Sequence, residues 1–341
     1  MKVTLETISK ETGFSVSTIS RALRAEGRIS EVNRKKILAS AHRLGYPLPV
    51  SRNKNREIRL PYFALITDYK IGEFYSSFCV GFVNAARKKN VSISLFSIIP
   101  NSNALFELIN DLQSLGFAGA IIFVPKLKQE QYEHLLISTP TDFPIISCSN
   151  IDNSVIDTVT FDAYQGATLV AKHFHESGFE KFGIIEGPKI MPESRFRTNG
   201  FNDFIKHVAQ KKILWNFQGD YSIESGSDAF YAYNKLNSKN KPDAIFVTND
   251  AMAIGFMEAA RREGVSIPED VAICGYDNLP ACDNHFPKIS SVDTDYELLA
   301  ENTIDNLLSR VNKNKAHQGI VSLVPVQLVV RESSQKNYRN D

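Results

Sequence analysis

Apolar residues recur along this chain in two different periods. From residue 62 onward, short runs rich in β-branched and aromatic residues alternate with stretches whose apolar positions repeat at helical spacing. The expected strands are Tyr62–Ile66, Ser92–Ser97, Ala120–Val124, Pro144–Cys148, Phe182–Ile185, Ala244–Val247 and Val271–Cys274. Helices are expected near 76–90, 104–115, 162–177, 194–210, 224–237, 251–263 and 295–312. This alternation predicts an α/β body made of two doubly wound parallel-sheet units with helices on both faces.

The first 45 residues follow a helical period only. Thr4, Ser15 and Ser30 each precede a helical pattern and have side chains that cap helix N-termini. Gly13 and Gly45 stand just beyond the ends of the first and third patterns. The tight turn between the first two patterns predicts an all-α helix-turn-helix. A plain three-helix bundle with a solvated basic face is the alternative.

Charge is distributed unevenly along the chain. Residues 1–60 contain 13 Lys and Arg against 5 Asp and Glu, a balance of +8, whereas the remaining residues hold 26 against 33, a balance of −7. The formal net charge of +1 therefore conceals a basic head and an acidic body. A basic segment that also has helix-capping residues and helix-ending glycines is typical of a nucleic-acid-binding module.

Length and composition indicate a soluble protein of two or three domains, with 341 residues of which 43% are hydrophobic and 23% charged. No apolar run approaches the ~20 residues of a membrane helix. The first residues lack the apolar stretch of a secretory signal, so a cytoplasmic location is expected. Four cysteines form no CxxC pair and are expected to be small buried side chains: Cys79, Cys148, Cys274 and Cys282.

The basic head carries a specific motif. Residues 4–23, Thr-Leu-Glu-Thr-Ile-Ser-Lys-Glu-Thr-Gly-Phe-Ser-Val-Ser-Thr-Ile-Ser-Arg-Ala-Leu, resemble the headpiece of the lactose/galactose repressor (LacI/GalR) family. Residues 29–37 and 44–47 resemble its third helix and exit. In such a head the second helix enters the major groove of DNA. The resemblance implies that Val16, Ser17 and Arg21 face base edges, where Arg21 can donate two hydrogen bonds to guanine.

Other basic and hydroxyl side chains of the head are expected to hold phosphates, which sets the register of binding without reading sequence. The run Arg34-Lys35-Lys36 is the main candidate, and a solvated helix face is its alternative. The full predicted DNA-binding set is Thr4, Ser15, Val16, Ser17, Thr18, Arg21, Arg34 and Lys35, with Asn55 and Arg56 from the linker that follows.

That linker, residues 47–61, departs from the family pattern. Its three prolines make it a poor autonomous helix. The family has a hinge helix here, whose leucine wedges into the minor groove. Asn55 stands near that leucine's position, and asparagine cannot wedge between base steps as an apolar side chain does. Arg56 and its basic neighbours are expected to follow phosphates or enter a narrow minor groove, and a flexible tether is the alternative.

The body resembles the effector domain of the same family, which has the fold of type I periplasmic sugar-binding proteins. The match is firmest from Pro242 to Asp277. The resemblance implies three chain crossings between two subdomains, near Phe161, 289–292 and 321–325. The expected organisation is a head at 1–46, a linker at 47–61, a ligand-binding domain at 62–335 and a polar tail at 336–341. Within the ligand-binding domain, the N-subdomain comprises 62–160 and 293–321, and the C-subdomain 161–290 and 323–335.

Ligands of open α/β sheets bind beyond the carboxyl ends of the strands. The resemblance implies that Arg197 binds a hydroxyl pair or a carboxylate and that Asp277 accepts hydrogen bonds from hydroxyls. It also implies that Phe74 and Tyr221 stack on a sugar ring or a base. Each role has a structural alternative. Arg197 suits a surface ion pair, Asp277 a turn cap, and Phe74 the core.

Further polar positions complete the expected effector site. Asn249 and Asp250 end another predicted strand, although Asp250 is also suited to cap the next helix. The predicted effector-binding set is Phe74, Tyr75, Asn150, Arg197, Tyr221, Asn249, Asp250 and Asp277. Ser149 and Asn150 differ from the acidic and aromatic residues that relatives have there, so a more polar and roomier pocket floor is expected.

The resemblance therefore implies a transcriptional repressor that binds a double-stranded, inverted-repeat operator as a homodimer and responds to a sugar-like effector. No cofactor, metal site or catalytic residue is expected, and no membrane partner. A solute-binding protein of sugar transport and an enzyme on a doubly wound fold are the alternatives. The chain has no GxGxxG, GxxxxGK[ST], GxSxG or HExxH motif, and its polar C-terminal tail has no heptads that would favour a tetramer.

Overall fold

The computed structural model describes residues 3–24, 29–44, 46, 60–68, 70–98, 102–140, 142–311 and 319–336. The chain divides into two compact units, Met1–Arg59 and Leu60–Asp341, which are called the head and the body below. Linker residues Asn55 and Arg56 lie outside the described residues, so the predictions for the hinge stay predictions.

The described part of the head consists of three helices around a small apolar core: α1 (Leu5–Thr12), α2 (Val16–Arg24) and α3 (Glu31–Arg43). The hydroxyl of Thr4 accepts a hydrogen bond from the N–H of Thr7 at 3.4 Å, and that of Ser15 accepts one from the N–H of Thr18 at 3.2 Å. Gly13 ends α1 with a φ of 77°, a left-handed conformation that costs glycine little. Capping and turn chemistry thus set the start of α2, which is the second helix of the predicted helix-turn-helix.

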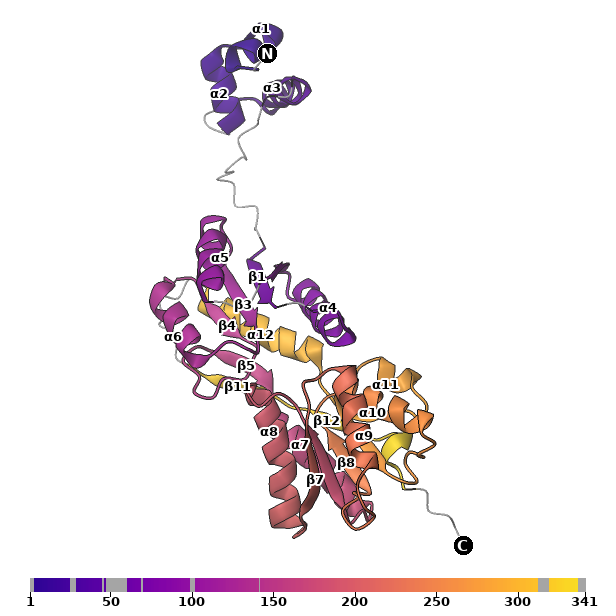
Figure 1. The fold of residues 1–341 in the computed structure, drawn as a ribbon. Helices are drawn as coiled ribbons and strands as arrows, with labels where there is room; N and C mark the ends of the chain where they lie inside the picture. The colour runs from indigo at the N-terminus through magenta and orange to yellow at the C-terminus, as the bar shows by residue number, and fades with distance from the viewer. Residues whose placement is uncertain are drawn as a thin grey trace. The chain divides into compact units, whose positions relative to one another are not determined.

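The first half of the body is built on a six-stranded parallel sheet with the strand order β11-β5-β4-β3-β1-β2. Its strands are β1 (Tyr62–Thr67), β2 (Ser92–Ser97), β3 (Gly119–Phe123), β4 (Ile145–Ser147), β5 (Thr158–Phe161) and β11 (Val321–Val324). The helices of this half are α4 (Glu73–Lys88), α5 (Ser102–Ser114), α6 (Gln129–Ser138) and α12 (Tyr296–Arg310). Figure 1 shows α12, which comes late in the sequence, beside α4 in this half.

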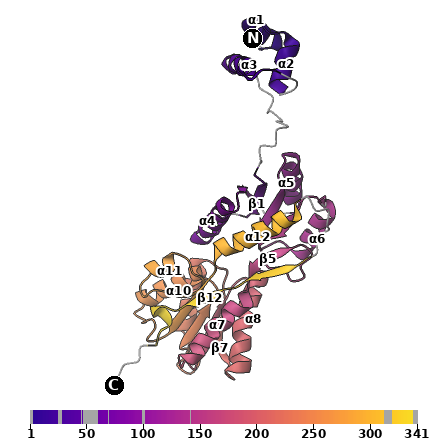
Figure 2. The same cartoon turned by 180° about the vertical axis from the view of Figure 1, so that it is seen from behind.

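The second half has a six-stranded sheet with the order β12-β10-β9-β8-β6-β7, in which only β12 runs antiparallel to its neighbour. Its strands are β6 (Phe182–Glu186), β7 (Ile213–Gln218), β8 (Ala244–Val247), β9 (Ala272–Asp277), β10 (Ser290–Asp293) and β12 (Gln327–Val329). Its helices are α7 (Ala163–Glu176), α8 (Pro192–Asp203) with a π-helical turn (Phe204–Val208), α9 (Ile223–Asn234), α10 (Asp250–Arg262), α11 (Ala281–Asn284) and a 3-10 turn (Glu332–Ser334). Figure 2 shows both halves from behind.

The chain crosses between the halves three times, and two crossings differ from the prediction. The first follows Phe161, near its predicted position. The second follows Asp293 instead of lying at 289–292, because β10 stays paired with β9 through Asp293. The third lies between Val324 and Gln327, because β11 pairs with β5 through Val324. Residues 323 and 324 therefore belong to the first sheet and not, as predicted, to the C-subdomain.

Apolar clusters cover both faces of each sheet, as expected for doubly wound units. Close helix packing in the second half depends on Gly255 of α10, because a Cβ there would lie 1.9 Å from the carbonyl oxygen of Ile223. All four cysteines are unpaired. Cys148, Cys274 and Cys282 are buried, as predicted, whereas Cys79 is only half-buried.

Candidate functional site

A cavity of about 420 Å³ opens between the two sheets of the body. Its lining comes from segments that follow the carboxyl ends of strands in both halves: residues 70–75 after β1, 149–150 after β4, 220–222 after β7 and Asn249 after β8, together with Asp277 at the end of β9. The position and the volume are those of a small-molecule site in an α/β protein.

Arg197 and Asp277 form the charged centre of this cavity. Arg197, on α8, donates from Nη2 to Oδ1 of Asp277 at 3.0 Å and from Nη1 to the carbonyl of Thr248 at 2.6 Å. Its guanidinium lies 3.7 Å from the ring centroid of Tyr276. Burial raises the pKa of Asp277, and the guanidinium opposes this rise. The pair is buried inside the cleft, which excludes the surface ion pair that the sequence left open for Arg197.

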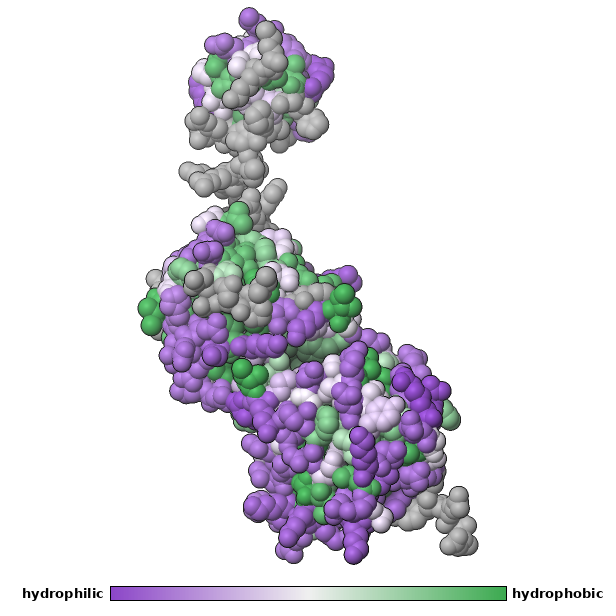
Figure 3. Space-filling view, viewed as in Figure 1, coloured by the Kyte–Doolittle hydropathy of each residue, from purple (hydrophilic) through white to green (hydrophobic). Residues whose placement is uncertain are grey.

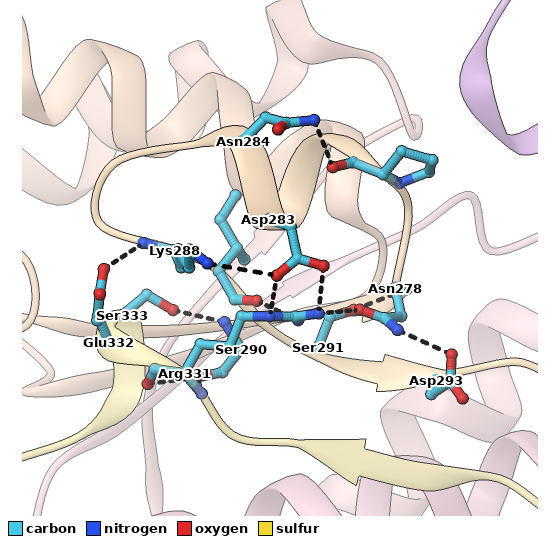
Figure 4. Close-up of polar contacts among 12 residues, drawn as sticks. Asn278, Asp283, Asn284, Lys288, Ser290, Ser291, Asp293, Arg331, Glu332 and Ser333 are labelled. Atoms are coloured by element: carbon cyan, nitrogen blue, oxygen red, sulfur yellow. Dashed lines mark hydrogen bonds and ion pairs between the residues drawn. The ribbon is translucent and has the colours of Figure 1, made fainter.

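The segment after Asp277 is held in an uncommon backbone conformation. Asp277 has a φ of 109° and Asn278 a φ of 48°, both in a region that non-glycine residues rarely adopt. Figure 4 shows the contacts that hold it: Arg331 donates to Oδ1 of Asn278 at 2.9 Å and pairs with Asp283 at 3.0 Å. Asn278 donates to Asp293 at 2.8 Å. A segment near the end of the chain therefore fixes the loop that carries Asp277.

Asp250 does not line the cavity, in contrast to the other predicted effector residues. Its carboxylate is buried and accepts hydrogen bonds from the N–H of Leu279 at 2.8 Å and from the hydroxyl of Ser291 at 2.6 Å. The cap of α10 is Asn249, which accepts from the N–H of Met252 at 3.1 Å. Asp250 is the first residue inside α10, and its side chain points beneath the loop after β9. It is therefore neither the cap of the helix nor part of the cavity wall.

Aromatic rings form one wall of the cavity. Phe74 lies 5.6 Å from Phe123 and 5.3 Å from Tyr75 between ring centroids, and all three line the cavity. Phe74 also stacks on the buried Phe78, so it serves the core and the cavity together. Tyr221 lines the cavity from the second half. Such rings suit the apolar face of a sugar.

Sequence reasoning missed one acidic residue of this cavity. Glu193 stands in the first turn of α8, one helical turn before Arg197, and it lines the cavity. Burial raises the pKa of its carboxyl to about 7. Helical spacing from Arg197 was the available signal, because residues four apart share a helix face. Ser149 and Asn150, predicted to make the floor more polar, also line the cavity.

The predicted DNA-binding residues of the head lie mainly on its surface. On α2, Val16, Ser17 and Arg21 are exposed, while Ile19 is buried in the core. Thr18 is half-buried and its hydroxyl lies 2.8 Å from that of Ser15, so it orders the start of the helix. Among the remaining predicted residues of the head, Thr4, Ser15 and Lys35 are exposed and Arg34 is half-buried.

No metal centre and no membrane span are found in the part of the chain that the structure describes. No group of three or more His, Cys, Asp or Glu side chains there is placed to hold a metal ion. None of the described helices has the length and apolar character needed to cross a membrane.

Comparison with known proteins extends over almost the whole chain. Residues 171–334 match the periplasmic binding protein-like domain. The HTH-type transcriptional repressor PurR of Photobacterium profundum is 25% identical over 336 residues, covering 97% of this chain and 98% of that protein. The lac repressor dimer bound to operator and the anti-inducer ONPF has a TM-score of 0.77 at 22% identity, covering 98% and 100% of the two chains.

A complex of the transcriptional regulator CelR with cellobiose has a TM-score of 0.69 at 21% identity, covering 97% of this chain and 100% of that one. These structures share the fold of the chain, and the match to the PurR repressor extends over nearly the full length of both proteins. The relatives of this chain in sequence are transcriptional regulators, which agrees with its resemblance to the LacI/GalR family.

Proposed function

We propose that this protein is a repressor that binds a specific operator through α2 and senses a sugar-like effector in the cavity between the two sheets. The observation that carries the proposal is the cavity itself, because its walls come from both halves of the body. A ligand that contacts both halves favours one relative arrangement of them. The ligand can change the affinity for DNA by no more than the ratio of its own affinities for the two arrangements.

The chemistry of the cavity supports a polyhydroxylated ligand. Asp277 accepts hydrogen bonds from hydroxyl groups, and Arg197 holds its carboxylate in place. Phe74 and Tyr221 offer aromatic faces to the C–H face of a ring. A relative with the same fold is described in complex with the sugar cellobiose. We propose that the ligand is bound and released without chemical conversion, so that the protein is not an enzyme.

An exposed apolar surface on the first half supports a homodimer. Val80 and Val83 of α4 are 57% and 55% exposed, and Leu95 of β2 is 49% exposed. Figure 3 shows apolar side chains gathered on the first half, between polar ones. Burial of such a surface in a symmetric pair places two heads on an inverted repeat. Because operator DNA is its partner, we propose that the protein acts in the cytoplasm.

The proposal is tested with the full chain and a library of random DNA duplexes. Repeated selection of bound duplexes is expected to give an inverted repeat, and sedimentation is expected to give a dimer. Arg21→Ala is expected to relax the selected sequence at one position in each half-site. Selection of no common sequence, or a monomer at micromolar concentration, contradicts the proposal.

A further inference from the structure

One carboxylate in the cavity has an oxygen that accepts no hydrogen bond. Glu193 lines the cavity, and its Oε2 atom is enclosed and accepts no hydrogen bond from the described residues. An enclosed carboxylate is costly when it is unpaired, because it has lost water without gaining a donor. Burial is also the main reason why the pKa of Glu193 is raised to about 7.

The other acidic groups of the cavity have partners within the protein. Asp277 is held by Arg197. Asp220 accepts hydrogen bonds from the N–H and the hydroxyl of Ser222 at 2.9 and 2.6 Å. Glu73 accepts one from a backbone N–H of α11 at 3.0 Å. Glu193 is thus an acidic residue of the described cavity with an enclosed oxygen to which no described group donates.

Arg197 and Arg195 lower the pKa of Glu193, but they offset the effect of its burial only in part. Arg197 directs both terminal nitrogens elsewhere, to Asp277 and to the carbonyl of Thr248. Lys70 lies at the exposed rim, where its charge acts on Asp68. The cavity therefore offers more negative than positive charge to a ligand, with an unpartnered carboxylate oxygen at one side.

We propose that the effector carries a protonated amine, as an amino sugar does, and that Glu193 binds this ammonium group. The inference rests on the proposed function, and it narrows the ligand from sugars in general to sugars with a positive charge. Hydroxyl groups of the same ligand bind at Asp277, and its ring lies against the aromatic wall. An ammonium group supplies the donors that Oε2 lacks and forms charge-assisted hydrogen bonds. A sugar acid or sugar phosphate, by contrast, brings a second negative charge next to Glu193.

The test measures ligand binding to the full chain by calorimetry and thermal shift. The probes are glucosamine, galactosamine and mannosamine, each with three matched compounds: the parent neutral hexose, the N-acetyl derivative and the uronic acid. At least one hexosamine is expected to bind about tenfold or more tightly than its three matched compounds. A neutral hexose or a uronic acid that binds as tightly as any hexosamine overturns the inference, and so does a panel in which no hexosamine binds.

Glu193→Gln assigns the effect to this side chain while keeping its shape. The variant is expected to lose at least tenfold in affinity for the hexosamine relative to its affinity for the neutral hexose. Glu186→Gln is the matched control, because Glu186 ends β6 in the same half and does not line this cavity. Unchanged hexosamine affinity in Glu193→Gln overturns the assignment.

The outcome for the inference can be told apart from the outcome for the proposed function. If a neutral hexose binds best and changes operator affinity, the proposed function as a ligand-responsive regulator stands, but the proposal that the effector carries an amine fails. If compounds bind and none of them changes operator affinity, it is the proposed function that fails.

Discussion

Replacement of Glu193 by glutamine should change the stability of the protein in a pH-dependent way, with the variant gaining on the wild type as the pH rises. The pKa of Glu193 is raised from 4.5 to about 7 by burial. The folded state therefore keeps a proton that the unfolded state releases, and stability falls as the pH rises from 4.5 to about 7 and stays level above that. At about 1.4 kcal/mol for each pKa unit, ionised Glu193 costs the folded protein about 3 kcal/mol above pH 7.

Glutamine removes the pH-dependent part of this cost. The amide still buries polar atoms at a cost of about 1–3 kcal/mol, but that cost is the same at every pH. Asp250 and Asp277 are present in both proteins, so their own titrations largely cancel in the difference. The melting temperature of the variant minus that of the wild type should therefore rise by roughly 5 °C between pH 4.5 and pH 8.

The assay is thermal unfolding of both full-length proteins across this pH range, without ligand. Glu186→Gln should give a difference that does not change with pH, because Glu186 does not line the cavity. If the melting temperatures of the wild type and of Glu193→Gln differ by the same amount at every pH, the reasoning is refuted.

Further substitutions test the ion pair in the cavity, the DNA-binding surface of the head and the helix packing of the second half. Arg197→Ala leaves its carboxylate partner buried and unpaired, so urea unfolding should show a loss of about 3–5 kcal/mol, and effector binding should disappear in calorimetry. Lys35→Ala should weaken operator binding about evenly across sequences and lower the slope of log affinity against log salt by about 1, whereas Arg21→Ala should change which bases are preferred. Gly255→Ala pushes a methyl group to 1.9 Å from the carbonyl of Ile223, so it should destabilise the protein by about 1–3 kcal/mol in chemical unfolding.

Strands with apolar side chains on both faces could be predicted from the sequence, since a parallel strand between two helical layers is a continuous apolar run. β8, Ala244–Val247, is buried at every position and was predicted with these bounds. β10, Ser290–Asp293, was missed because two of its residues are serines. Both serines are buried, and Ser290 bonds to residues near the C-terminus, as in the 2.9 Å bond from its N–H to Ser333. Only the folded chain brings that partner close.

The candidate cavity could be predicted only in part, because its walls come together only in the folded chain. Arg197 and Asp277 lie far apart in the chain and were expected together because of the family resemblance. Asp250 was misjudged because the end of a strand does not tell which way the next side chain points, and here it points under a loop. Glu193 was missed because an acidic residue in the first turn of a helix is common on any surface. Its enclosure becomes visible only when the second wall of the cavity is in place.

The central claim is that one chain couples the cavity in its body to the affinity of its head for DNA. The most direct test is a fluorescence anisotropy titration of the full chain on the duplex obtained by selection, with and without a saturating amount of the ligand found in the binding screen. The claim predicts that the ligand changes the Kd for this duplex at least about fivefold, and that Arg197→Ala still binds the duplex but no longer responds. Equal Kd values with and without a ligand that demonstrably fills the cavity would contradict the claim.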